Sequence, residues 1–126
     1  MEIELLMKPD SNALFWNDDG DCIGDYESLS IYSKDDLVMV IKEINFDNNE
    51  LKLWGWDFLW NAIIPCESGK ISLEELASQF DWKKFNKQGI EFAKVIKKLL
   101  PNNVILKYSS PFEDRSIYRI DEMIIA

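Results

Sequence analysis

Residues 81–108 read DWKKFNKQGIEFAKVIKKLLPNNVILKY, and this stretch decides the fold. Its first part repeats apolar or small residues at steps of four and three, at Phe85, Gly89, Phe92, Ile96 and Leu99. This period predicts a long helix with one buried face, which begins after Asp81 as the N-cap and ends at the turn of residues 101–103. Residues 104–108 are mostly apolar and predict a strand. A long helix that leads directly into a strand indicates a fold that mixes helices and sheet.

Two more helices are predicted before this stretch. Ser72 and Glu75 form an S-x-x-E capping box, and it is followed by apolar residues at helical spacing, which are Leu73, Leu76, Ala77 and Phe80. Ser33 is the predicted N-cap of the other helix, which is lined by Leu37, Ile41 and Ile44. Residues 50–64 instead begin with an alternating pattern, so we predict a strand through Trp56 and irregular structure up to Pro65.

The remaining apolar segments predict strands near both ends of the chain. They lie at 2–7, at 13–16, within 22–32 and at 116–125, separated by turn-forming residues at 9–12, 17–20 and 109–111. Asp19-Gly20 is a hairpin signal. We therefore predict an α+β fold in a single domain, residues 1–126, with a mostly antiparallel sheet of about four to six strands and three helices packed on one of its faces.

Composition excludes most catalytic chemistry. The chain of 126 residues contains no histidine, so it lacks the side chain most often used for acid–base catalysis near neutral pH. It has no phosphate-binding glycine motif, and its two cysteines, Cys22 and Cys66, fit neither a metal-binding nor a disulfide pattern. We expect no enzymatic activity, no cofactor and no structural metal. A small enzyme that works through carboxylates is the least favoured alternative.

The start of the chain lacks the pattern of a signal peptide, and no apolar run is long enough to span a membrane. A cytoplasmic location is the expectation. The net charge is −9, and residues 1–64 hold 14 of the 23 acidic residues and only 4 of the 14 basic ones. An acidic surface repels nucleic acid and anionic membranes and attracts cationic partners. The lysines of the long helix are expected to form a solvated face, and an RNA-binding stripe is the less favoured alternative.

The acidity is concentrated in WNDDGDCIGDYE, residues 16–27, and continues at the start of the next predicted helix. Aligning either glycine of this stretch with the glycine of a calcium-binding EF-hand loop places apolar or aromatic residues at ligand positions, so at most weak calcium binding is expected. A solvated hairpin turn is one interpretation, and a surface for a cationic partner is the other. The candidate partner-binding residues are Trp16, Asp18, Asp19, Asp21, Asp25, Glu27, Asp35 and Asp36.

A second candidate contact surface contains the aromatic residues Trp54, Trp56, Phe58 and Trp60. Tryptophan is favoured at the centre of binding interfaces. Burial in the core is the better expectation for most of these side chains.

The run FWNDDGDCIGDYESLSIYSKDDLVMVIKEI, residues 15–44, resembles the start of bacterial immunity proteins of contact-dependent growth inhibition and related polymorphic toxin systems. The shared features are an aromatic strand, an acidic turn and a Ser-capped helix. The resemblance implies a cytoplasmic protein that binds one cognate toxin domain, often a nuclease, and blocks it. An acidic adaptor or nucleic-acid mimic, as in phage anti-defence proteins, is the alternative. The sequence leaves the oligomeric state open.

Overall fold

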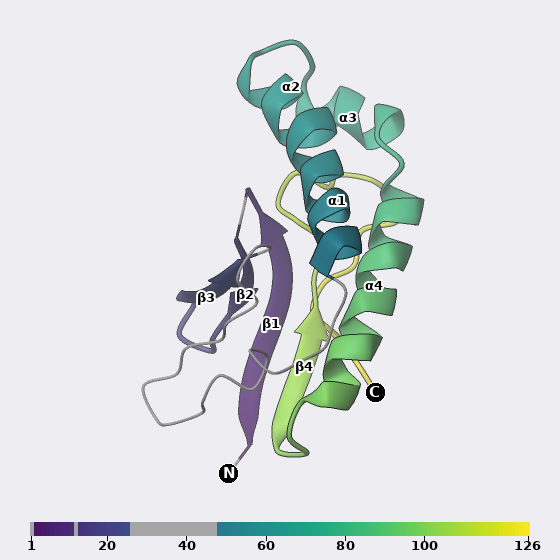
Figure 1. Ribbon diagram of the computed structural model, residues 1–126. Helices are drawn as coiled ribbons and strands as arrows, with labels where there is room; N and C mark the ends of the chain where they lie inside the picture. Colours follow the sequence, from purple (N-terminus) through teal and green to yellow (C-terminus); the bar gives the residue numbers. More distant parts are fainter. Residues whose placement is uncertain (1, 12, 26–47) are drawn as a thin grey trace.

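The computed structural model describes residues 2–11, 13–25 and 48–126 (Figure 1). The predicted helix at 33–44 lies outside these residues. In chain order the elements are β1 (Ile3–Asp10), β2 (Ala13–Trp16), β3 (Cys22–Asp25), α1 (Asn48–Phe58), η1 (Leu59–Ile63), α2 (Ile64–Glu67), α3 (Leu73–Gln79), α4 (Trp82–Leu99), β4 (Val104–Tyr108) and β5 (Met123–Ile124). The π-helical turn η1 joins α1 and α2 without a break.

The five strands form one sheet in the order β3-β2-β1-β4-β5. Neighbouring strands are antiparallel, with the exception of β1 and β4, which run parallel and pair Leu5 with Leu106. The α+β class and the mostly antiparallel sheet are therefore confirmed. The strand order places the two parallel strands at the centre and the N-terminal meander on one side.

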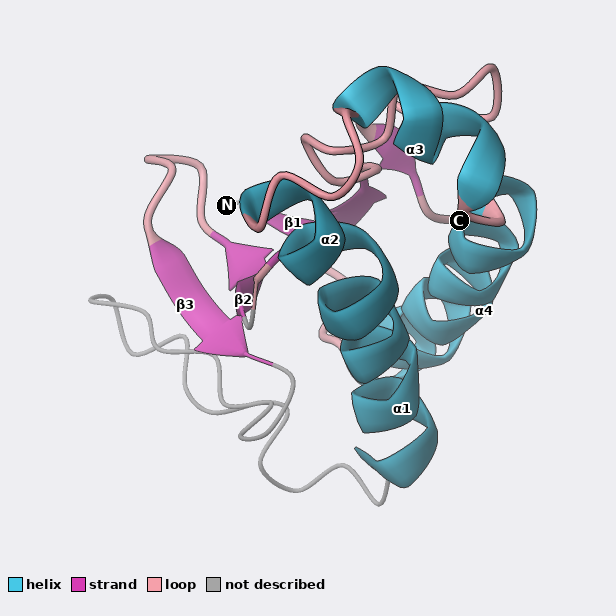
Figure 2. Ribbon diagram, turned by 90° about the horizontal axis from the view of Figure 1, so that it is seen from above, coloured by secondary structure: helices cyan, strands magenta, loops and turns pink. Residues whose placement is uncertain are grey.

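The two faces of the sheet differ in what covers them. Leu5 and Met7 of β1 and Leu106 of β4 are buried on one face, and α1 and α4 lie over this face side by side (Figures 1 and 2). Side chains alternate along a strand, so Leu6 and Lys8 belong to the other face. None of the described helices covers that second face.

Aromatic rings join the two long helices to each other. The ring of Trp54 on α1 stacks on Phe85 of α4 with their centroids 4.4 Å apart, and its indole N–H donates to the Phe85 carbonyl at 3.0 Å. Trp82 packs edge to face against both Phe85 and Phe58, and Phe58 lies tilted against Phe85. The hydrogen bond satisfies the polar atom of a buried tryptophan, so α1 is held in one orientation on α4.

The strand predicted through Trp56 is wrong, because residues 48–58 are α-helical. Leu51, Trp54 and Phe58 are buried at steps of three and four, which is a helical period. The segment also fits an alternating pattern over a short window, with Leu51 and Leu53 on one face and the aromatic residues on the other. Packing decides between the two, because a strand would place Leu51 opposite Trp54 and Phe58, whereas a helix buries all three on one side.

Other boundaries were predicted with mixed success. The capping box is confirmed: the Ser72 hydroxyl accepts from the backbone N–H of Glu75, and the Glu75 carboxylate accepts from the Ser72 N–H. Asp81 caps α4 as predicted. The buried face of α4 includes Ala93. Leu99, which was predicted to belong to it, is 44% exposed, because Leu100 turns inward instead. The closing strand predicted at 116–125 is reduced to the two residues of β5.

A buried polar network explains why the C-terminal segment is not a strand. Asn86 of α4 donates to Asp114 at 3.0 Å and accepts from the hydroxyl groups of Tyr108 and Ser110, both at 3.0 Å. The Ser110 hydroxyl also accepts from the Ile120 N–H at 2.8 Å. These side-chain bonds replace the strand ladder and tie residues 109–120 to α4 and β4.

Candidate protein-binding surface

The acidic turn joins β2 to β3, and the side chain of Asn17 organises it. The Asn17 carbonyl oxygen Oδ1 accepts from the backbone N–H groups of Asp19 at 3.0 Å and Asp21 at 2.9 Å. The backbone closes the loop with bonds from Asn17 N to Asp21 O and from Gly20 N to Asn17 O. Gly20 has a φ of +83°, which glycine adopts without a steric penalty. The turn is therefore fixed by its own residues.

Its three carboxylates, Asp18, Asp19 and Asp21, are all exposed to solvent. Among the described residues the only ion pairs are Lys107 with Glu4 and Arg119 with Asp121, so no described lysine or arginine forms an ion pair with the turn. Three like charges within four residues concentrate negative potential at one corner of the sheet.

Trp16 connects this turn to the second face of the sheet. It is half-buried, and its indole N–H donates to the Lys8 carbonyl at 2.9 Å. A hollow with a volume of about 450 Å³ lies beside it, between β1, the acidic turn and the C-terminal segment. Four carboxylates and two ammonium groups line the hollow, namely those of Glu4, Asp10, Asp18, Glu122, Lys8 and Lys107. Their balance is negative, so the hollow favours a cationic side chain over an anionic one.

The structure brings together part of the predicted site. Trp16 and Asp18 line the hollow, and Asp19 and Asp21 stand on the same turn. Asp25 lies further along, at the end of β3 opposite Ala13. The other three candidates, Glu27, Asp35 and Asp36, lie outside the described residues.

Sequence reasoning missed the acids that line the hollow from other elements. Glu4 and Asp10 belong to β1, and Glu122 precedes β5. Alternation along β1 was a usable signal, because Glu4, Leu6 and Lys8 share a face that opposes the buried Leu5 and Met7. Nothing in the sequence placed Glu122 beside them, since β5 reaches that position only through β4.

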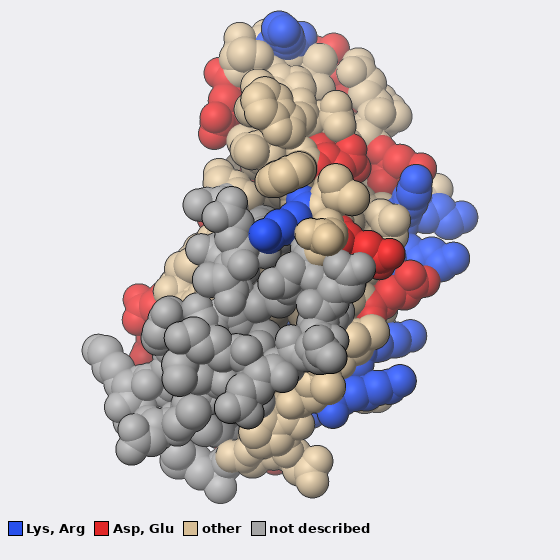
Figure 3. Space-filling model, in the orientation of Figure 1, with Lys and Arg blue, Asp and Glu red and all other residues tan. Residues whose placement is uncertain are grey.

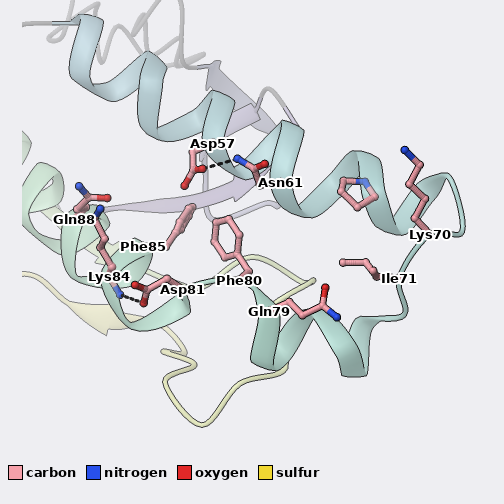
Figure 4. A pocket seen from close by; sticks show the side chains of 11 residues that line it. Asp57, Asn61, Lys70, Ile71, Gln79, Phe80, Asp81, Lys84, Phe85 and Gln88 are labelled. Atoms are coloured by element: carbon pink, nitrogen blue, oxygen red, sulfur yellow. Dashed lines mark hydrogen bonds between the residues drawn. The ribbon is translucent and has the colours of Figure 1, made fainter.

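A second hollow is a cleft of about 520 Å³ between the α1–η1–α2 arm and the helices α3 and α4 (Figure 4). Asp57 and Asp81 lie on its opposite walls. Asp57 accepts from Asn61 of its own helical arm at 2.7 Å, and Asp81 accepts from the backbone N–H of Lys84 at 3.1 Å (Figure 4). Lys70 and Lys84 balance the two carboxylates, so this cleft has no preferred sign of charge.

Glu113 is the one described carboxylate with a raised pKa. Burial is the main cause; Asp10 and Glu67 add to it, while its own backbone N–H and Lys8 oppose it. Its buried oxygen Oε1 accepts no hydrogen bond. Cys66 lies nearby, and burial followed by Glu113 and Glu75 raises the pKa of its thiol, which disfavours a reactive thiolate. Both cysteines are free.

Within the described ranges, no cluster of three or more His, Cys, Asp or Glu side chains has the arrangement of a metal site. Over the same ranges, no helix combines the length and apolar character that crossing a membrane requires. Comparison with known proteins adds no relative: no family model matches the sequence, and neither does any curated protein or solved structure.

Proposed function

We propose that this chain is an immunity protein, which binds a cationic domain of a cognate bacterial toxin, most simply a nuclease, and neutralises it. The carrying observation is the acidic turn: three exposed carboxylates on a loop that Asn17 fixes, at the rim of a negatively charged hollow. A domain that binds phosphates tends to be basic, so an acidic inhibitor complements it. On this proposal the chain acts in the cytoplasm, by binding and without catalysis.

The fixed turn suits this task for two reasons. A loop that already holds its bound shape loses less conformational entropy when a partner arrives. Charges that protrude from the sheet also guide a cationic partner during diffusion, and this raises the association rate. Trp16 adds a half-buried ring beside the charges, so an arginine that enters the hollow can meet both a carboxylate and an aromatic surface.

The proposal expects the gene for a toxin domain to lie next to this gene. The test is co-expression with that domain, followed by co-purification and measurement of the association rate. Replacing Asp18, Asp19 and Asp21 by Lys reverses the field of the turn. Association should slow by about 10- to 1,000-fold at low salt, because steering acts on the association rate. The gap should shrink as salt rises, since the screening length is about 8 Å at physiological salt.

A matched control changes the net charge by the same amount elsewhere. Glu67, Glu74 and Glu91 are exposed on α2, α3 and α4, so replacing these three by Lys preserves the acidic turn. This control should slow association much less. Equal slowing by both triple variants would show that the turn is only a solvated loop, without a role in binding. Capture of a nucleic-acid-binding protein that is not a toxin would favour the acidic adaptor or nucleic-acid mimic.

A further inference from the structure

Helix α1 is apolar on two opposite sides. Its inner side buries Leu51, Trp54 and Phe58 against α4 and the sheet. Its outer side exposes Leu53, and together with η1 it also exposes Trp56 and Trp60, at 60%, 50% and 63% of their surfaces. Steps of three and four residues place the last three side chains on one face of a helix. We call these three residues the α1 stripe. A surface helix needs only one apolar side to face the core, so the second apolar side of α1 is left over for another contact.

The outer face of α4 shows what a solvated helix of this chain looks like. It exposes Lys83, Lys87, Lys94 and Lys98, and Figure 3 shows the basic side chains along this edge of the molecule. The α1 stripe has a different composition. A tryptophan carries about 150–250 Å² of surface, so two half-exposed rings and a leucine present on the order of 300 Å² of apolar area. Patches of this size on a monomer are often functional.

The charges beside the α1 stripe limit the choice of occupant. Glu50 and Asp57 flank it and are exposed, while Lys52, the only base of α1, is half-buried at its edge. Carboxylates beside exposed tryptophans disfavour an anionic membrane and nucleic acid. A second copy of the chain would bring its own net charge of −9. Arginine suits both features, because its guanidinium pairs with carboxylates and stacks on indole rings.

We propose that the α1 stripe is a docking surface for an amphipathic cationic segment of a protein partner, with aliphatic side chains against Trp56 and Trp60 and arginine beside Glu50 and Asp57. The stripe lies on the helical layer, and the acidic turn borders the face that no described helix covers. This inference therefore does not depend on the toxin-binding proposal. It assigns a second contact surface to the chain.

The probe is a synthetic helical peptide with leucine and arginine along one face, compared with the same peptide carrying glutamate in place of arginine. Tryptophan fluorescence and calorimetry report binding to the full chain. The arginine peptide should bind at least tenfold more tightly than the glutamate peptide. Replacing Trp56 and Trp60 by Ala should weaken its binding about tenfold or more and remove the blue shift of the fluorescence.

The matched control is the pair Phe112→Ala and Ile117→Ala, which removes two exposed apolar side chains of the C-terminal segment. It should change affinity by less than about twofold. The pair Glu50→Gln and Asp57→Asn should weaken arginine-peptide binding several-fold and reduce its salt dependence. Circular dichroism checks that each variant is folded.

Three results would overturn this inference. The first is equal affinity for the two peptides. The second is unchanged binding by the variant that lacks Trp56 and Trp60. The third is concentration-dependent dimerisation that the same variant abolishes, which would assign the α1 stripe to a second copy of the chain.

Discussion

Gly89 is the residue at which α4 approaches the sheet too closely for any side chain. A Cβ at this position would lie 2.5 Å from the Tyr108 hydroxyl oxygen and 2.6 Å from its ring carbons. Tyr108 cannot move aside cheaply, because its ring is buried and its hydroxyl donates to Asn86. Burial also raises the pKa of this phenol, so it stays neutral and remains a donor.

Gly89→Ala should therefore lower the free energy of unfolding by about 1–3 kcal/mol, the usual cost of overpacking a core. This direction is opposite to helix propensity, by which alanine gains about 1 kcal/mol over glycine. Urea denaturation measures the change. Gln88→Ala on the exposed side of α4 is the control and should stay within about 0.5 kcal/mol. A stabilised Gly89→Ala variant would contradict the close contact.

Glu113 should make stability depend on pH in the direction opposite to an ion-paired carboxylate. Its pKa is raised above the ordinary value of 4.5, so the folded chain holds this proton to higher pH than the unfolded chain does. Its contribution favours the folded state below 4.5 and is lost as pH rises through the raised value.

Glu113→Gln should remove this loss, with a gain on the order of 0.5 kcal/mol at pH 7, because the side chain is only partly buried. The measurement is the free energy of unfolding of the wild type and of the variant at pH 4 and pH 7. The variant should be more stable than the wild type only at pH 7. An advantage that is the same at both pH values would point to packing as the cause. Glu122→Gln, at an exposed site, is the matched control.

Among the elements, those fixed by local chemistry were predictable and those fixed by packing were not. The capping box at Ser72 and the turn at 17–20 follow from side chains that bond to nearby backbone. Helix α1 was misread because ELKLWGWDFLW fits both a strand and a helical period, and Phe85 decides between them. The candidate site likewise has a part that the sequence predicts and a part that only the fold assembles. Asp18, Asp19 and Asp21 are visible in the sequence, whereas Glu122 joins them only through the strand order.

The hairpin β2–β3 gives a test of whether a fixed turn matters. Asn17→Ala removes an acceptor for two backbone N–H groups and leaves every carboxylate in place. The free energy of unfolding should fall by about 1 kcal/mol, as for the loss of a helix cap of similar chemistry. Hydrogen exchange at Asp19 and Asp21 should speed up. Asn61→Ala, whose side-chain bond lies within the α1–η1 arm, is the control and should leave this exchange unchanged.

At the scale of the whole molecule, the charge is unevenly spread. Residues 1–64 contribute a net charge of −10 and residues 65–126 contribute +1. Like charges repel within a compact chain, and only two ion pairs, both partly exposed, occur among the described residues. Within the first half of the chain, residues 3–25 of the N-terminal meander hold six acidic residues and one lysine, so the meander carries a concentrated share of the repulsion.

Salt should stabilise the fold for this reason. Raising ionic strength from about 10 mM to 150 mM shortens the screening length from about 30 Å to about 8 Å. A relief of about 1 kcal/mol corresponds to a rise in Tm of about 3–5 °C in a domain of this size. Replacing Asp18, Asp19 and Asp21 by Asn should reduce the rise, and replacing Glu67, Glu74 and Glu91 by Gln should reduce it less. If the Tm of the wild type and of both triple variants did not change with salt concentration, charge repulsion would be negligible.

The parallel pair of β1 and β4 sets the order in which a newly made chain can fold. Leu5 meets Leu106, so the centre of the sheet stays open until about 100 further residues have been translated after β1. At about 5–20 residues per second, the wait lasts on the order of 5–20 s. The acidic turn is synthesised well before β4, whereas Glu122 on the other wall of its hollow follows β4 in the chain. A product released before Val104 lacks the strand that β1 pairs with, so it cannot complete the centre of the sheet.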